Sequence, residues 1–196
     1  MKFIVVGYYT RGTFYEGLAS EFEESLKKYA ISYYIEAIDS LGDWHLNTSY
    51  KPTFLKQMLR KFPDKDIVYV DVDAKFFAYP ILFESLQCNI AVHLFDRRLH
   101  RTKATGFEVL SGTVFLKNNE EVRGLVDKWE ALCIAKPYVW DQKSLEKVLG
   151  EDFYNLPPEY CIIFDVMKHI KDPVIVHYQA SRKVRKNKRL LKKKVV

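Results

Sequence analysis

The stretch IVYVDVDAKFF, residues 67–77, places two carboxylates directly after a run of apolar and aromatic side chains. Residues 67–70 carry no charge, which is typical of a strand buried on both faces. Asp71 and Asp73 follow, with Val72 between them. Because strand side chains alternate, both aspartates point the same way if the extended backbone continues.

Two neighbouring carboxylates repel each other, and the repulsion favours the protonated form of each. A divalent cation removes this cost, and Mg²⁺ or Mn²⁺ prefers oxygen ligands and can bind a diphosphate at the same time. The pair therefore predicts a metal site at the end of this strand. A surface turn, where aspartate is common, is the alternative.

Strands and helices alternate along the rest of the chain. Apolar runs predict strands at 3–6, 32–38, 67–70, 90–95 and 112–117, and two late strands within 160–164 and 174–178. Helices are predicted after Thr13 and Glu16, which have capping-box spacing, after Pro52 and Pro80, and at 119–135 and 141–150. This alternation indicates one α/β domain with a mostly parallel sheet, whose ligands bind beyond the carboxyl ends of the strands.

Composition is that of an ordinary globular protein. The 196 residues suffice for one domain with a sizeable core, and 48% of them are hydrophobic. Cys88, Cys133 and Cys161 show no zinc-ligand spacing, so we expect reduced thiols. The first apolar run is too short for a signal peptide, and no run approaches the roughly 20 residues of a membrane span. The sequence therefore predicts a cytoplasmic protein.

The positive charge is concentrated at the C-terminus. Residues 182–194 hold nine Lys/Arg and no acid, and subtracting them from the net charge of +6 leaves the rest near −3. A nucleic-acid-binding fold is therefore not expected. A block of like charges is usually solvated, and the functional alternative is peripheral contact with an anionic membrane, where each basic residue contributes about 1 kcal/mol.

Five segments, in order along the chain, resemble those of GT-A-fold glycosyltransferases that use a nucleotide-diphosphate sugar. They are FIVVGYYT (3–10), DVDA (71–74), SGTVFLKN (111–118), WDQKSL (140–145) and HYQASRK (177–183). The last two resemble the glycogenin-like retaining branch. The resemblance implies a single Rossmann-like GT-A domain at 1–181, with a mixed, mostly parallel sheet flanked by helices, and a basic tail at 182–196.

The resemblance also implies an activity and its metal. The expected reaction is metal-dependent transfer of a sugar, with retention, from a nucleotide-sugar donor, a UDP-sugar, to an unknown acceptor. Asp71, Asp73 and His177 are the implied ligands of Mn²⁺ or Mg²⁺. Taken alone, His177 on an apolar strand would be read as a core histidine.

Further residues follow from the resemblance. Those implied to bind the nucleotide and donor are Tyr8, Tyr9, Thr10, Asp39, Lys51, Val72, Arg182 and Lys183. Asp141 and Gln142 are implied to be catalytic and to face the donor sugar, and Ser111, Gly112 and Trp140 to lie on the acceptor side. Trp44 could stack on a base or sugar, although packing is the simpler expectation.

The sequence departs from the family pattern near its end. Ala180 stands where the closing motif has glycine, and Val184 and Arg185 replace a Pro-Trp pair. Arg182 could therefore take the role of Lys183 against the diphosphate.

Two other classes of protein remain open. A haloacid-dehalogenase-like phosphohydrolase also carries Asp-x-Asp, but on its first strand and without a residue like Lys75 two positions later. A catalytically inactive module that binds lipid or polyanion through its tail is the other alternative.

Overall fold

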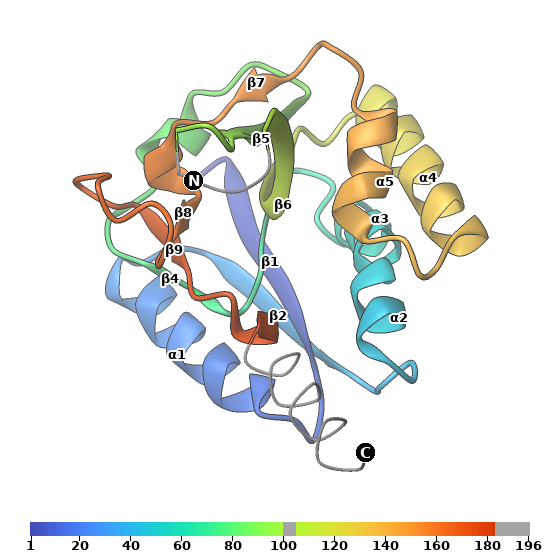
Figure 1. Ribbon diagram of the computed structural model, residues 1–196, viewed down its shortest axis with the longest axis horizontal. Helices are drawn as coiled ribbons and strands as arrows, with labels where there is room; N and C mark the ends of the chain where they lie inside the picture. Colours follow the sequence, from blue (N-terminus) through green and yellow to red (C-terminus); the bar gives the residue numbers. More distant parts are fainter. Residues whose placement is uncertain (100–104, 183–196) are drawn as a thin grey trace.

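The structure is a computed structural model that describes residues 1–99 and 105–182. Within these residues, a six-stranded sheet has the order β2-β1-β3-β6-β5-β7, and a three-stranded sheet has the order β4-β9-β8 (Figure 1). β1 pairs parallel with β2 and β3, and β5 pairs parallel with β7, whereas β6 runs antiparallel to β3 and β5. The predicted α/β class, with a mixed and mostly parallel sheet, is confirmed.

The elements alternate along the chain largely as the sequence predicts. The strands are β1 (Phe3–Thr10), β2 (Tyr33–Ile38), β3 (Asp66–Val70), β4 (Ala74–Phe76), β5 (Ile90–Asp96), β6 (Phe107–Leu116), β7 (Tyr154–Asn155), β8 (Ile162–Ile163) and β9 (Ile175–His177). The helices are α1 (Tyr15–Lys28), α2 (Trp44–Ser49), α3 (Lys51–Lys61), α4 (Glu120–Ala135) and α5 (Asp141–Val148), with 3₁₀ turns η1 (Ile81–Glu84) and η2 (Pro158–Tyr160).

Both faces of the large sheet are covered because side chains of its central strands alternate. Phe3 and Val5 of β1 pack in one core cluster with Phe22 of α1. Ile4 and Val6 of the same strand pack in the other cluster, with α3, α4 and α5. α1 therefore lies on one side of the sheet and α3–α5 on the opposite side (Figure 1). This two-sided burial is what the uncharged run of β1 predicts.

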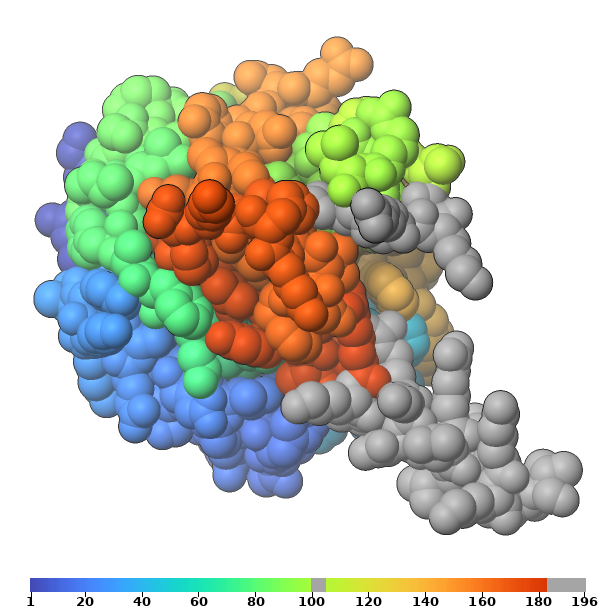
Figure 2. Space-filling model, turned by 60° about the vertical axis from the view of Figure 1, so that its left-hand side comes forward, coloured from blue at the N-terminus to red at the C-terminus, as the bar shows by residue number. Residues whose placement is uncertain are grey.

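The late strands form a sheet of their own. β9 pairs antiparallel with β4 and parallel with β8, so segments far apart in sequence lie side by side. In Figure 2 the chain after β7, coloured orange to red, packs beside the green segment that contains β4 and η1. This small sheet joins the end of the described chain to the segment that follows β3.

One local prediction is wrong, and one helix was not predicted. The Thr13–Glu16 capping box does not form: Glu16 accepts a hydrogen bond from the N–H of Gly12 at 2.8 Å, outside the helix. Helix α2 was not predicted, and the side chain of Asp43 caps it by accepting from the N–H of Leu46 at 3.0 Å. Within the described residues, 1–99 and 105–182, no helix is long and apolar enough to cross a membrane.

Candidate active site

The Asp-x-Asp pair lies where β3 leaves the large sheet. β3 ends at Val70, and the N–H of Ala74 bonds to the carbonyl of Asp71 at 3.0 Å, closing a turn before β4 begins. The extended backbone therefore does not continue through Asp71 and Asp73. The turn brings their carboxylates together instead, at the carboxyl end of β3, as expected for a ligand site in an α/β sheet.

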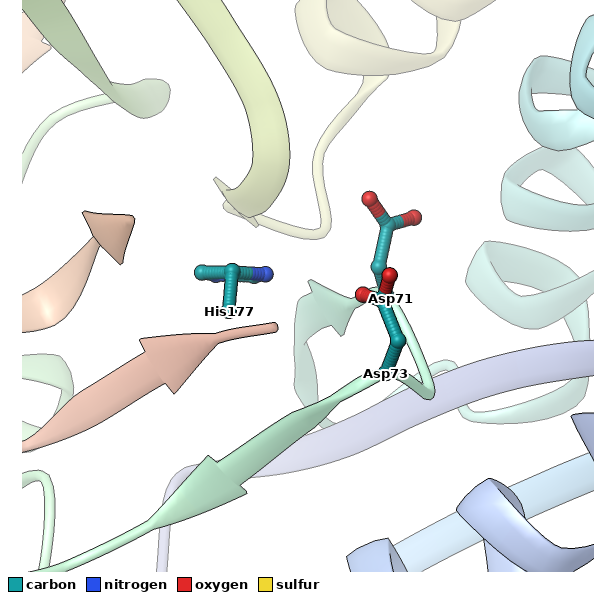
Figure 3. A group of neighbouring side chains, drawn as sticks. All are labelled: Asp71, Asp73 and His177. Atoms are coloured by element: carbon teal, nitrogen blue, oxygen red, sulfur yellow. The ribbon is translucent and has the colours of Figure 1, made fainter. Parts of the chain in front are cut away.

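His177 reaches the aspartates through strand pairing. It lies opposite Ala74 in the β4–β9 pair, and the N–H of Tyr178 bonds to the carbonyl of Asp73 at 2.9 Å. One ligand atom from each of Asp71, Asp73 and His177 lies within 4.8 Å of the others. Figure 3 shows the imidazole facing the two carboxylates across a gap.

Protein groups already hold one oxygen of each carboxylate. Asp71 Oδ1 accepts from the hydroxyl of Tyr69 at 2.8 Å and lies 3.3 Å from Lys51 Nζ. Asp73 Oδ2 accepts from the N–H of Ala180 at 2.8 Å. These bonds fix the orientation of both side chains, and they turn Asp71 Oδ2 away from the Lys51 ammonium.

Gly112 leaves the space that separates the ligands. A Cβ atom at this position would lie 3.1 Å from His177 Nδ1 and 3.3 Å from Asp71 Oδ2, both tighter than ordinary contact. Two carboxylates and one imidazole form a donor set that suits Mn²⁺ or Mg²⁺. The residues therefore fit a divalent cation of the predicted kind.

Burial shifts the pKa of two members of this cluster, Asp73 and His177. Burial, together with the neighbouring charge of Asp71, raises the pKa of Asp73 to about 6. Burial lowers the pKa of His177 to about 4, so its imidazole is neutral at physiological pH. A cation relieves the repulsion that raises the pKa of Asp73, and it needs the uncharged imidazole that burial of His177 provides.

Lys51 is the positive charge at the base of the site. Its Nζ lies 2.9 Å from Asp141 Oδ2 and 3.0 Å from the carbonyl of Ser111, and the residue is 4% exposed. Burial alone would lower the pKa of Lys51, but the carboxylates of Asp141 and Asp71 outweigh it and the pKa is raised. Lys51 therefore stays charged and joins Asp71 to Asp141.

One cavity gathers most of the predicted site residues. Those lining it are Tyr8, Tyr9, Thr10, Lys51, Asp71, Val72, Asp73, Ser111, Gly112, Trp140, Asp141, Gln142 and His177. They come from six segments of the chain, which meet at the carboxyl ends of β1 and β3 and along β6. The residues predicted to bind the metal and those predicted to bind the donor thus share one space.

Solved structures with a similar fold were found, although no protein-family model and no curated protein matches the chain. A glycosyltransferase involved in glycosylation of the major capsid of PBCV-1 superposes with a TM-score of 0.70 at 20% identity, covering 93% of this chain and 95% of that one. The galactosyltransferase LgtC, solved with donor and acceptor sugar analogs, gives 0.58 at 9% identity, covering 90% and 87%. The glycosyltransferase GlyE of Streptococcus pneumoniae TIGR4 superposes with a TM-score of 0.63 at 15% identity. The match covers 92% of this chain and 55% of GlyE.

The chain has the GT-A glycosyltransferase fold. Its likeness to these structures extends over nine-tenths of its length, as the order of the sequence motifs predicts. It spans nearly all of the PBCV-1 enzyme and about half of GlyE.

Among the described residues that were predicted to bind the donor, two do not line the cavity of this GT-A fold. Asp39 is exposed at the end of β2 and pairs with Arg11 at 2.8 Å. Arg182 forms two contacts, at 2.8 and 2.9 Å, with the carboxylate of Asp165. Lys183 lies outside the described residues, as does the rest of the basic tail.

Two tryptophan side chains form one rim of the cavity. Trp44 of α2 and Trp140, just before α5, both line it, and their rings meet edge to face with centroids 5.9 Å apart. Trp44, for which packing was the simpler expectation, thus also lines the cavity. No periodic signal marks Trp44, because its helix of six residues is too short to show one.

The closing motif resolves one departure from the family pattern. Gln179 has a φ of +53°, the left-handed region, whereas Ala180 is not among the residues with positive φ. Ala180 donates its N–H to Asp73 and is buried. Its methyl group is therefore accommodated without backbone strain, and the unusual conformation falls on Gln179, which lines the cavity.

Proposed function

We propose that this chain is a glycosyltransferase that depends on Mn²⁺ or Mg²⁺ and moves a sugar from a nucleotide-diphosphate donor, a UDP-sugar, to an acceptor with retention. The observation that carries the proposal is the cluster of Asp71, Asp73 and His177 in the cavity of a GT-A fold, with ligand atoms within 4.8 Å. LgtC, which shares the fold, was solved with a donor sugar analog.

Asp71, Asp73 and His177 would hold the cation. When bound, it supplies positive charge that offsets the charge developing on the departing nucleoside diphosphate. The chain prepares for this in two ways: Tyr69 and Lys51 orient the carboxylate of Asp71, and burial keeps His177 neutral. Gly112 keeps the space between the ligands open.

The nucleotide would lie along the end of β1. Tyr9 and Thr10 line the cavity there, and Tyr8 lies beneath with its hydroxyl donating to the carbonyl of Asn47 at 2.8 Å. Asp39 keeps a role only at the outer end of a bound nucleotide, because its carboxylate pairs with Arg11 on the surface. Val72 lies between the two aspartates on the cavity wall.

Asp141 and Gln142 would face the donor sugar. Asp141 is buried, and its Oδ2 accepts from Lys51 and from the hydroxyl of Ser111 at 2.9 Å. Gln142 donates its Nε2–H to Glu108 at 2.7 Å, which fixes its amide. Both residues thus have defined orientations at the cavity wall. The acceptor would enter past Ser111, Gly112 and the Trp44–Trp140 rim, whose rings offer apolar faces to a sugar.

Arg182 and Lys183 would neutralise the leaving diphosphate. For Arg182 this requires release of its pair with Asp165, which is on the surface and so costs little to break. The domain at 1–181 would then be catalytic, and the tail at 182–196 would provide contact with an anionic membrane from the cytoplasm.

Titration calorimetry with UDP, with and without Mn²⁺, tests the proposal. We expect UDP binding that requires Mn²⁺, and its loss in Asp71→Asn and Asp73→Asn variants that keep the wild-type circular dichroism. Slow hydrolysis of one UDP-sugar from a panel, abolished in the same variants, would identify the donor. UDP binding that ignores Mn²⁺, or hydrolysis unaffected by both substitutions, would refute the metal-dependent transferase.

The same experiments separate the alternatives. A phosphohydrolase would release phosphate from simple phosphomonoesters, but the Asp-x-Asp pair here follows β3 in a GT-A fold, which does not favour it. An inactive module would bind vesicles or polyanions and neither bind nor hydrolyse nucleotide-sugars.

A further inference from the structure

The imidazole of His177 can present a lone pair to a cation from only one of its nitrogens. A neutral histidine carries a proton on either Nδ1 or Nε2, and the unprotonated nitrogen binds metal. In this structure Nδ1 borders the space left by Gly112, on the side of Asp71 Oδ2. A proton on Nδ1 would therefore point at the position that a cation needs.

Thr113 is the partner of the other nitrogen. Its Oγ1 lies 2.8 Å from His177 Nε2 and 3.1 Å from the carbonyl oxygen of Tyr160. Thr113 is fully buried on β6, and His177 is 4% exposed. The imidazole of His177, the hydroxyl of Thr113 and the carbonyl of Tyr160 are thus linked by two consecutive hydrogen bonds beneath the predicted metal ligands.

The Tyr160 carbonyl decides the direction of this chain. A carbonyl oxygen only accepts, so the hydroxyl hydrogen of Thr113 belongs to that bond. The oxygen of Thr113 then accepts from His177, which requires a hydrogen on Nε2. The thiol of Cys161 also lies beside this hydroxyl, but a thiol is a weak hydrogen-bonding group and does not compete with the carbonyl.

We propose that Thr113 is a positioning residue that holds His177 in the Nε2–H tautomer and thereby turns the Nδ1 lone pair toward Asp71 and Asp73. The metal that this lone pair would bind rests on the proposed function, whereas the tautomer does not. The opposite tautomer would leave the buried Tyr160 carbonyl without this donor, which is unfavourable for a buried polar group.

The geometry around Nδ1 fits the same assignment. Among the residues described, no hydrogen bond joins His177 to either aspartate, so a proton on Nδ1 would have no acceptor to compensate it. Partners that fix the tautomer of a metal-binding histidine are a general feature of metal sites, and removing one typically weakens metal binding about 10–100-fold.

Nitrogen NMR of the metal-free protein tests the tautomer directly. In protein labelled with ¹⁵N-histidine, long-range ¹H–¹⁵N correlations distinguish the two tautomers, and a His177→Gln variant assigns the signal. We expect the Nε2–H pattern for His177 at pH 7.5. An Nδ1–H pattern for His177 in the wild-type protein would overturn the inference.

Two substitutions at Thr113 test its role. Thr113→Val keeps the shape and removes the hydroxyl, so we expect Mn²⁺ binding, followed by electron paramagnetic resonance, to weaken about 10–100-fold. Thr113→Ser keeps the hydroxyl and should restore both the tautomer and the affinity. Wild-type affinity in the valine variant would overturn the role of Thr113, as would equal loss in both variants.

Failure of the proposed function looks different. If the wild-type protein binds neither Mn²⁺ nor UDP, the transferase is refuted while the NMR result still decides the tautomer.

Discussion

Lys51 and Asp141 form a buried ion pair at the base of the cavity, with Nζ 2.9 Å from Oδ2 and both side chains less than a tenth exposed. Lys51 begins α3 and Asp141 begins α5, so the pair joins two helices that cover the same face of the sheet. The ammonium of Lys51 also lies 3.3 Å from Asp71 Oδ1. The side chain that joins the two helices therefore also contacts a predicted metal ligand.

Replacing Lys51 with methionine should destabilise the protein strongly. Removing one partner of a buried pair leaves an uncompensated charge and typically costs about 3–5 kcal/mol. Urea unfolding should show this loss for Lys51→Met, and adding Asp141→Asn should recover part of it, because the second change removes the stranded carboxylate.

The exposed pair of Arg11 and Asp39 provides the control. Its side chains are 58% and 84% exposed, so Arg11→Ala should cost less than about 1 kcal/mol. Equal losses in Lys51→Met and Arg11→Ala would show that burial of the Lys51 pair contributes nothing to stability.

Gly112→Ala should impair cation binding. The added Cβ would lie 3.0 Å from the ring of His177 and 3.3 Å from Asp71 Oδ2, so one ligand has to move. We expect Mn²⁺ affinity, measured by calorimetry, to fall about 10–100-fold, as when the surroundings of metal ligands are disturbed.

Gly124→Ala is the matched control for that substitution. Gly124 lies within α4, and its added Cβ meets nothing within 4 Å. The alanine should raise the free energy of unfolding by about 0.5–1 kcal/mol through helix propensity and leave Mn²⁺ affinity unchanged. Mn²⁺ binding by Gly112→Ala that matches this control would contradict the assignment of the site.

Asp73 should make the metal-free protein less stable as pH rises. Its pKa in the folded protein is raised to about 6 from an ordinary value of 3.8, so the folded state binds this proton more tightly than the unfolded state. The stabilising contribution is fully present below about pH 4 and is lost as pH rises through 6.

Asp73→Asn removes this titration. In EDTA, the variant should gain stability over the wild-type protein as pH rises from 4 to 7, reaching on the order of 2 kcal/mol in urea unfolding. Mn²⁺ should then stabilise the wild-type protein and not the variant. A stability difference that stays constant with pH would argue against the raised pKa.

Shortening the chain after Lys186 should separate catalysis from membrane contact. The deletion removes five of the nine basic residues at 182–194 and keeps Arg182 and Lys183. We expect unchanged hydrolysis of the donor and weaker cosedimentation with vesicles that contain phosphatidylserine, because each lost charge contributes about 1 kcal/mol to adsorption. Equal binding by both proteins would remove the membrane proposal; neutral vesicles are the control.

The main sheet could be predicted because its strands carry their own signals. β1 and residues 67–70 of β3 are uncharged runs buried on both faces, and α4 has an apolar stripe and the Asn119 cap. β4 was missed because Ala-Lys-Phe is too short to show a pattern, and it is a strand only through its pairing with β9. Tertiary pairing of this kind leaves no local trace.

The site was predictable to the extent that neighbours in sequence build it. The spacing of Asp71 and Asp73 predicts a metal site, whereas His177 was predicted as a ligand only through a family resemblance. Lys51 was placed near the donor by the same resemblance. Its burial was not predicted, because a lysine is seldom buried and this one depends on the distant Asp141. Thr113 gave no signal, since threonine is an ordinary residue in a strand.

The antiparallel pairing of β4 with β9 determines when the site can exist. During synthesis both aspartates leave the ribosome long before the histidine that lies opposite Ala74. A nascent chain that stops short of β9 already contains every strand of the large sheet, yet it offers a cation only two carboxylates that repel each other. Metal binding at this position would therefore mark a polypeptide in which β9 has been made and docked.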